Sequence, residues 1–469
     1  MPLFFTYFFT FSFFISAVFV SAQSLEQPTE TILSFEAYIG YVKKHHPLVK
    51  QANLVLAFGA ATLLKAQGGF DPTFDVDYDR KEFKNTEYFD LLNTTFRIPT
   101  WYGIEFKATF EEHTGVFLNP NLTMPEGGLY SAGVSFSLAQ GFLINERMAA
   151  LKKARFFEVQ TKADRDVLVN TILFDASTAY FEWVEATNEQ RIFDTSLENA
   201  LTRLTAVSRS VAMGDKAAID ITEARIIHSD RQLYLEAARL KSRKAALKVS
   251  TFLWINDTPV ELQDTVVPLF PEQSKIASSL NLLGTIDDEQ GTIDHPRLRS
   301  LDAKINGLII DKKLKQNKLL PKLDVYYNLL SPSVAANSFN TANYKAFVHF
   351  SVPLFLRTER GDVRVAKIKL QEAGFERSAT SLSIRNNIDV VNAEIASLEI
   401  QYGIIKLIIT DYMALLSAES RRFFLGESSL FLINAREQKL IDAKRTENEI
   451  GVKQLLATAR LYRALGIIL

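Results

Sequence analysis

The sequence predicts a mainly α-helical protein with some β-strands, in which a unit of long coiled-coil helical hairpins and short strands occurs twice in tandem. The first observation behind this fold class is a pair of stretches that align without a gap. Each opens on His-Pro, at residues 46–47 and 295–296, and runs into an alternating segment led by proline, at 72–78 and 321–327. Self-similarity of this kind is the signature of a repeated supersecondary unit.

The second observation is that another matching pair follows in each half. Residues 130–136 match residues 344–350, and each is followed by a long helical pattern that breaks at Gly214 or at Gly426. Each half therefore has the order helix, strand pair, two very long helices. We expect the first repeat to cover residues 23–254.

The remaining boundaries follow from the repeats. The second repeat is expected at residues 293–469, and the proline-containing residues 255–292 are expected to form an irregular connector. Residues 1–22 resemble a secretory signal peptide, because a nearly continuous apolar run ends in Val20 and Ala22, small residues at the −3 and −1 positions of a cleavage site. No Lys or Arg precedes the run. An uncleaved anchor helix is the alternative.

Composition excludes several classes of function. Lys and Arg number 53 against 54 Asp and Glu, a formal net charge of −1, so no basic surplus favours a nucleic acid as partner. The absence of cysteine excludes disulfides and thiolate metal sites. The sequence also has no motif of a nucleophilic serine, a zinc protease or a phosphate-binding loop. We expect no enzyme, no cofactor and no metal, so any driving energy must come from a partner.

The helical segments carry long apolar seams. In the first repeat the seam residues, spaced by three or four, are Leu168, Ile172, Ala176, Ala179, Trp183, Ala186, Gln190, Phe193, Leu197, Ala200, Leu204, Val207 and Val211. In the second they are Ile388, Val391, Ile395, Leu398, Tyr402, Ile405, Ile409, Tyr412 and Leu416. Such long seams predict coiled coils, in helices approaching about 100 Å in length.

A returning helix is predicted after each glycine. The first has apolar residues at every seventh position, which we expect to close the hairpin against the preceding helix. These residues are Ile219, Ile226, Leu233, Leu240 and Leu247. The last segment has a weaker seam, made of Ile433, Leu440, Leu455, Ala459 and Tyr462.

The predicted strands alternate in character. Even-numbered positions are apolar in segments 74–78, 130–136 and 344–350, and most odd-numbered positions are small or polar. This alternation fits a barrel in lipid with a wet interior, and equally any half-buried sheet. Residues 104–110 suggest an extra strand, whereas residues 84–100 have no readable pattern.

No later apolar run reaches the roughly 20 residues of a membrane-spanning helix, and Gly403 to Leu416 comes closest. A chain that crosses a bilayer without such helices must do so as a closed β-barrel. About four strands per chain cannot close a barrel, so several copies would each have to contribute strands, with their helices packed below. A helical cylinder joined to a barrel is a duct.

The sequence resembles the TolC-type outer-membrane efflux proteins over nearly the whole mature chain. The clearest local similarity is in segment 423–436, in which Gly426 precedes an apolar-polar helix start and then an Ala-Arg pair. Segment 213–225, around Gly214, is its weaker counterpart. The two are offset by one residue, so we expect the second tip to be the shorter.

The resemblance implies a homotrimer with a 12-stranded transmembrane β-barrel in the outer membrane of a Gram-negative bacterium, embedded in lipid, and a helical tunnel through the periplasm. It implies a passive duct for efflux or type I secretion, opened by a periplasmic adaptor and an inner-membrane transporter. The implied adaptor contacts are the hairpin tips: Met213, Gly214, Asp215, Leu425, Gly426, Glu427 and Ser428.

The resemblance also implies a periplasmic gate just past each tip. Asp220 and Glu223 occupy the gate positions in the first repeat, and Leu432 and Asn434 occupy them in the second. Asp220 and Glu223 also suit the amino terminus of a helix, where the dipole favours acids. Both tip glycines suit helix ends that require positive φ.

Other polar residues have simpler explanations than chemistry. Asp75, Asp77 and Asp79 lack the glycine and the distant glutamate of a calcium loop, so strand alternation explains them. His46 and His295 each precede a proline and are expected to start helices.

Two other functions stay open on the sequence alone. A periplasmic adaptor, or membrane fusion protein, also combines a helical hairpin with β-structure, but usually has a single hairpin. A structural coiled-coil protein or adhesin does not explain the strand pair that recurs between helices. The sequence specifies neither the transported substrate nor the class of pump.

Overall fold

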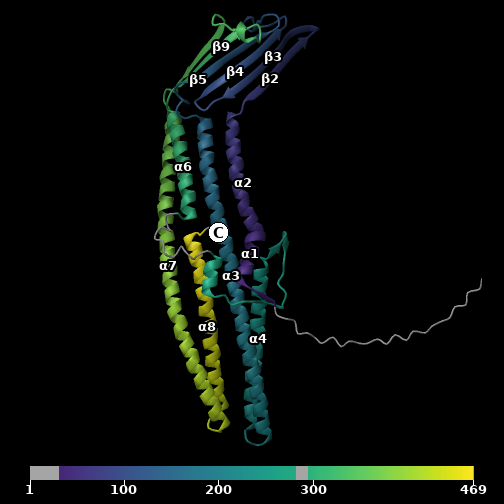
Figure 1. Cartoon of the computed structure of the whole chain (residues 1–469), viewed down its shortest axis with the longest axis vertical. Coiled ribbons are helices and arrows are strands. Elements are labelled where there is room, and N and C mark those ends of the chain that lie inside the picture. Colours follow the sequence, from purple (N-terminus) through teal and green to yellow (C-terminus); the bar gives the residue numbers. More distant parts are fainter. Residues whose placement is uncertain (1–30, 281–293, 468–469) are drawn as a thin grey trace, which may run out of the picture.

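The computed structural model describes residues 31–280 and 294–467. The expected signal peptide at 1–22 and the connector residues 281–292 lie outside the described residues. Figure 1 shows a long layer of helices with a β-sheet at one end and two helical hairpin tips at the other. The carboxyl end lies about midway along the layer.

Among the described residues, six long helices form the layer, in three pairs of similar length. α2 and α6 have 21 and 22 residues, α3 and α7 have 67 and 68, and α4 and α8 have 33 and 36. Their bounds are Pro47–Gln67 (α2), Glu146–Ala212 (α3), Ala218–Ser250 (α4), Pro296–Asn317 (α6), Arg357–Phe424 (α7) and Leu430–Leu465 (α8).

The helices lie side by side in a fixed order. α3 packs against α2 and α6 near the sheet and against α4 and α8 near the tips, while α7 packs against α6 and α8. The order across the layer is therefore α2-α3-α6-α7 near the sheet and α4-α3-α8-α7 near the tips. The two edges of the layer are α2 with α4 on one side and α7 on the other.

The two His-Pro dipeptides start helices, as predicted. His46 and His295 are the N-cap residues of α2 and α6, and the Nδ1 atom of each accepts a hydrogen bond from the backbone N–H two residues on, at 3.2 and 3.1 Å. The following proline takes the first helical position, where its missing N–H costs nothing. An accepting Nδ1 requires a neutral ring.

His295 makes this cap sensitive to pH. Burial, followed by the charges of Arg297 and Arg299, lowers the pKa of His295 to about 4. The unfolded chain, with an ordinary histidine pKa of about 6.5, therefore binds the proton more readily than the folded chain. The contribution of His295 to stability is complete above pH of about 6.5 and is lost as the pH falls toward 4.

We expect His295→Asn, which keeps a capping acceptor, to reduce the loss of thermal stability between pH 7 and pH 4.5. Melting temperatures across this range measure the effect, with His45→Asn at the last residue of α1 (Phe35–His45) as control. A His295→Asn protein with the wild-type pH slope would contradict the assignment.

The predicted seams of α3 and α7 are confirmed as packing faces. Every α3 seam residue is buried or half-buried except Leu168, which is 45% exposed. The α7 seam packs against α8 in a cluster that includes Leu398, Ile405 and Ile450.

The expectation for the seven-residue series of α4 is wrong. Its members are 41–69% exposed: Ile219, Ile226, Leu233, Leu240 and Leu247. α4 instead buries Ala224, Leu235 and Ala238, which lie about half a turn away from Leu233 on a helix of about 3.6 residues per turn. α4 thus has two apolar faces, and the residues that the structure describes cover only one of them.

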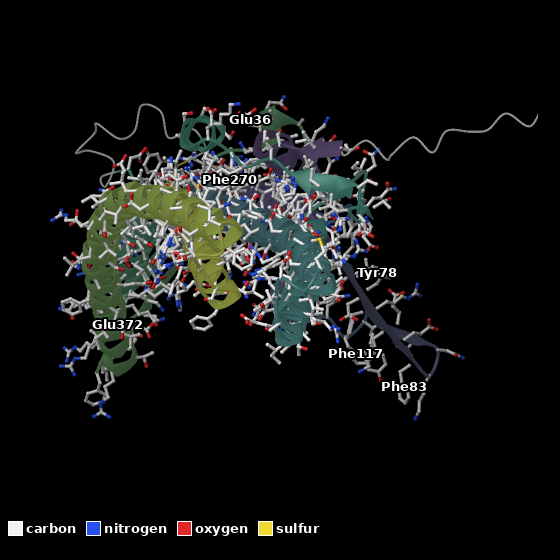
Figure 2. The ribbon with its side chains drawn as sticks, turned by 90° about the horizontal axis from the view of Figure 1, so that it is seen from below. Glu36, Tyr78, Phe83, Phe117, Phe270 and Glu372 are labelled. Atoms are coloured by element: carbon white, nitrogen blue, oxygen red, sulfur yellow. The ribbon has the colours of Figure 1, made fainter. Side chains whose placement is uncertain are left out.

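The largest hydrophobic core lies midway along the layer, where α1 and the connector cover α3 and α8. Tyr180 of α3 is fully buried there, and its hydroxyl donates to the carbonyl oxygens of Leu33 and Leu269 at 2.7 and 2.9 Å. In Figure 2 the helices form a curved layer, and Glu36 and Phe270 lie on its convex side.

The described part of the connector contains three short strands and one helix. β6 (Trp254–Ile255) pairs with β7 (Thr258–Pro259), and β8 (Val266–Pro268) pairs in parallel with β1 (Thr31–Leu33). α5 (Gln273–Ser279) follows, and its Ile276 is fully buried in the same core.

Six described strands form one antiparallel sheet above the helices, in the order β10-β9-β5-β4-β3-β2. Their bounds are Thr73–Phe83 (β2), Thr86–Pro99 (β3), Ile104–Thr114 (β4), Leu129–Ser137 (β5), Lys322–Ser331 (β9) and Tyr344–Ser351 (β10). The expectation of about four strands is wrong, because the unreadable residues 84–100 contain β3. Lys84 and Asn85, with φ of 52° and 55°, form the two-residue turn between β2 and β3.

Cross-strand pairing gives the sheet one apolar and one polar face, since directly opposed residues of antiparallel strands share a face. One row on the apolar face is Phe74, Phe96, Ala108, Ala132, Leu329 and Tyr344. The adjacent row on the polar face is Thr73, Arg97, Lys107, Gly133, Asn328 and Lys345. No described residue outside the sheet covers the apolar face: Phe74 is 68% and Val348 61% exposed.

The expectation that no later segment could span a membrane was too strict. By length and composition alone, two described helical segments are apolar enough to span a membrane, Pro47–Phe70 and Arg357–Phe424, each through its most apolar 18-residue stretch. Both belong to the packed helical layer, on its edges. Their apolar residues are largely exposed in the single chain, so these edges lack a covering partner.

Candidate functional site at the helical hairpin tips

Both hairpin tips have the same construction. Each is a five-residue loop, Met213–Ala217 between α3 and α4 and Leu425–Ser429 between α7 and α8. The expectation of a shorter second tip is therefore wrong. The Ala-Arg pair does come one residue sooner after Gly426 than after Gly214, but both pairs lie inside the helix that follows the tip. Gly214 and Gly426 have φ of 85° and 80°, the left-handed conformation that glycine adopts most readily.

The hydrogen bonds of the two tips are also equivalent. The N–H groups of Gly214 and Asp215 donate to the carbonyls of Val211 and Ser210, at 3.0 and 2.9 Å. In the second tip the N–H groups of Gly426 and Glu427 donate to Phe423 and Arg422, at 3.1 and 2.8 Å. Both patterns are Schellman motifs, which satisfy the last carbonyls of a helix.

The predicted contact residues lie on the surface of the loops. Met213 is 70% and Leu425 is 73% exposed, and Asp215 and Glu427 are exposed as well. Ser428 is only half-buried, and its hydroxyl donates to the Glu419 carboxylate at 2.5 Å. Sequence reasoning missed two large apolar neighbours, Phe424 at 82% and Phe431 at 68% exposed.

The two tips pack against each other within one chain. Lys216 of the first tip lies over the ring of Phe423, in the last turn of α7 before the second tip, 3.7 Å from its centroid, an attractive cation–π contact. Below this contact a small apolar cluster joins α3, α4, α7 and α8. Its members are Leu204, Val207, Val211, Ile221, Ala224, Phe423 and Leu430.

A buried polar layer lies above that cluster and joins the two hairpins. The Arg203 guanidinium of α3 donates to both carboxylate oxygens of Glu437 on α8, at 2.7 and 3.2 Å. Arg203 also donates to the Asn434 amide oxygen at 3.0 Å, and the Asn434 amide nitrogen donates to Glu223 of α4 at 3.2 Å. The side chains of Arg203 and Glu437 are only 17% and 5% exposed. We name Arg203, Glu223, Asn434 and Glu437 the polar clasp.

The structure brings together two of the four predicted gate residues. Glu223 and Asn434 belong to the polar clasp, whereas Asp220 is half-buried in the first turn of α4 and Leu432 is exposed. Sequence reasoning missed Arg203 and Glu437. A signal for Glu437 exists, because it stands at the seam spacing, four residues after the buried Ile433.

A second ionic layer crosses the same helices further from the tips. Glu189 of α3 accepts from Lys241 of α4 at 2.7 Å and from Arg445 of α8 at 2.9 Å. Burial raises the pKa of Glu189, but the hydrogen bonds and charges of Lys241 and Arg445 outweigh it, so the net pKa is lowered. This layer therefore also joins α8 of the second hairpin to α3 and α4 of the first.

We expect Gly426→Ala to loosen the second tip. The added Cβ would meet no atom within 4 Å, so the cost is the left-handed backbone, about 1–2 kcal/mol. Amide hydrogen exchange of residues 421–432 should become faster. Gly403→Ala, at an equally open site inside α7, should leave the tip unchanged. Equal exchange at the tip in the two variants would refute the role of positive φ.

Comparisons with known proteins identify the architecture. No protein-family model matches the chain, and no curated protein sequence matches it significantly. Solved structures do match. The Vibrio cholerae outer membrane protein VceC is 13% identical, with a TM-score of 0.65, over 92% of this chain and 95% of that one. The open-state outer membrane channel MtrE of Neisseria gonorrhoeae is 13% identical, with a TM-score of 0.64, over 92% and 88%.

The Campylobacter jejuni outer membrane channel CmeC is also 13% identical, with a TM-score of 0.63, over 92% of this chain and 84% of that one. Similarity at this level of identity reports the fold alone, and it supports the expected mainly helical fold with some strands. The chain has the fold of these outer membrane channels.

Proposed function

We propose that this protein is the outer-membrane component of a tripartite efflux or type I secretion system. Three copies form a passive duct from the periplasm to the exterior. A periplasmic adaptor and an inner-membrane transporter open it and supply the energy. The proposed signal peptide at 1–22 directs export, and the repeats at 23–254 and 293–469 with the connector at 255–292 arose by tandem duplication.

The observation that carries this proposal is the amphipathic sheet with two free edges. An uncovered apolar face suits contact with lipid, and a polar opposite face suits a water-filled interior. The edge strands β2 and β10 are exposed along their whole length. Unpaired edges cannot persist inside a bilayer, because each unsatisfied backbone group costs several kcal/mol. Neighbouring copies supply the missing pairs.

The edges of the helical layer support the same assembly. α4 exposes its seven-residue apolar series, and α7 exposes Ile400, Ile404 and Leu407 on the face away from its own seam. The two series lie at the same distance along the chain from the hairpin tips. Leu233 comes 19 residues after Gly214, and Leu407 comes 19 residues before Gly426. Packing α4 of one copy on α7 of the next buries both series.

The tips are the proposed contact with the adaptor and the closing end of the duct. Met213, Phe424, Leu425 and Phe431 form an exposed apolar surface at the end of the layer, and such surfaces mark sites of protein contact. The polar clasp holds the two hairpins of each chain together and favours the closed state. The adaptor opens the duct by favouring separation of the hairpins.

One observation favours the duct over an adaptor. The strands of both halves join in one continuous sheet through the pairing of β5 with β9. An adaptor with one hairpin splitting a β-domain has no such arrangement. A coiled-coil structural protein needs no sheet with one apolar face.

Purified protein reconstituted in planar lipid bilayers tests the proposal. We expect small, long-lived conductance steps from the closed duct, and larger steps for Gly426→Ala, with Gly403→Ala as matched control. Absence of any conductance from protein that inserts into lipid would refute the duct. Unchanged steps in Gly426→Ala would refute only the gate at the tips.

A further inference from the structure

In the six-stranded sheet of the described residues, the first half of the chain contributes four strands and the second half contributes two. α2 leads into β2 and β5 leads into α3, just as α6 leads into β9 and β10 leads into α7. The β3–β4 pair is additional. It does not lie on top of the sheet but inside it, because β3 pairs with β2 and β4 pairs with β5 along almost their whole lengths.

The additional pair is anchored at its base. The connection between β3 and β4 contains Trp101, whose ring stacks on Phe70, three residues beyond the end of α2, with centroids 5.6 Å apart. The Asn145 side chain, at the start of α3, donates to the Trp101 carbonyl at 3.1 Å. Arg147 of α3 forms an ion pair with Glu105 of β4. The additional pair is therefore an integral part of the junction between sheet and helices.

The width of the sheet supports the same conclusion. Tilted strands about 4.8 Å apart each occupy about 6 Å of a barrel's circumference. Six strands then span about 36 Å, close to the about 32–40 Å of the four helices beneath them. Four strands would span only about 24 Å. The described sheet matches the helical layer on which it stands.

The free edges fit each other. Strand direction alternates across the six antiparallel strands, so β2 and β10 run in opposite directions. A ring of copies joined edge to edge therefore continues the antiparallel pattern. Even-numbered residues lie on the apolar face in both edge strands, so the faces also match across the junction.

Charges on the polar face are complementary across this junction. β2 carries Asp77 and Asp79, which form no ion pair within the described residues. β10 carries Lys345 and His349 on the same face. If the strand ends nearest the helices are aligned, Asp79 stands opposite Lys345, and Asp75, which pairs with Arg97 within its own chain, stands opposite His349. Opposite charges directly across two antiparallel strands stabilise their pairing.

We propose that three copies close into a barrel of 18 strands, six from each chain, with β2 of one copy paired to β10 of the next. The inference rests on the proposed function, from which the trimer comes. Because barrel diameter grows roughly linearly with strand number, the exit is about 1.5-fold wider than that of a 12-stranded barrel. The duct is thus not narrowed at the membrane, which suits it to bulky cargo.

Electron microscopy of the wild-type protein in lipid nanodiscs tests the proposal by counting strands. The absence of native cysteine permits a second test. Val76→Cys combined with Val348→Cys, one on each edge strand, should form links between chains and give covalent dimers and trimers after denaturation. Val76→Cys combined with Val134→Cys should stay unlinked, because β3 and β4 lie between these positions.

The outcomes separate this inference from the proposed function. A membrane-embedded trimer with 18 strands and the expected links supports both. A trimer with 12 strands, in which Val76→Cys links to Val134→Cys, overturns the wide barrel but leaves the duct intact. Absence of any membrane-embedded oligomer overturns both.

Discussion

Arg203→Met is expected to open the hairpin tips. The substitution leaves the Glu437 carboxylate, with a side chain only 5% exposed, without its cation. Removing one partner of a buried ion pair costs about 3–5 kcal/mol. Since the polar clasp joins the two hairpins of one chain, the loss falls on the contact that keeps them together. Hydrogen exchange of residues 430–440 should accelerate, and bilayer conductance should increase.

Two variants control for this result. Arg239→Met removes an exposed cation of α4 whose partners, Asp194 and Glu236, are also exposed, and it should cost no more than about 1 kcal/mol. Arg203→Met with Glu437→Met replaces both charges by apolar groups and should recover much of the loss. Wild-type exchange at the tip of Arg203→Met would show that the polar clasp does not hold the hairpins.

Leu233→Glu is expected to abolish the trimer while leaving the single chain folded. Leu233 is 67% exposed in the chain, so its substitution removes no intrachain core contact. In the proposed assembly the same residue is buried against α7 of the next copy. Losing a buried leucine costs about 1.5–3 kcal/mol, and burying an unpaired carboxylate adds to it. The effect recurs at all three interfaces of the ring.

Gln232→Glu provides the matched control, because it adds the same charge one residue away on an exposed flank of α4. Particle mass in detergent measures the oligomer, and circular dichroism measures helix content. Trimers of Leu233→Glu as abundant as those of Gln232→Glu would place the interface elsewhere.

The long helices could be predicted because a seam that repeats over many turns identifies which residues face a partner. The positions of Leu398 and Ile405 follow from that rule, and both pack as expected. The tip glycines were predictable for a similar reason, since a glycine that breaks a long helical pattern marks a turn with positive φ. Both glycines have that conformation.

Three features were beyond sequence reasoning for physical reasons. Periodicity shows that α4 has an apolar stripe but not whether the stripe faces its own chain or another. β3 carries polar Asn93, Thr94 and Thr95 at its centre, so both of its faces look alike. Arg203 and Glu437 are 234 residues apart. Because charged residues in helices are usually solvated, nothing in the sequence indicates that these two form a buried pair.

No single copy can pair the edges of its own sheet, so several copies must enclose one water-filled passage. The mass of the protein extracted from membranes in mild detergent, measured by analytical ultracentrifugation, tests this directly. We expect a particle of three chains that needs detergent to stay in solution. A stable particle of one chain, soluble without detergent, would show that the sheet edges need no partner.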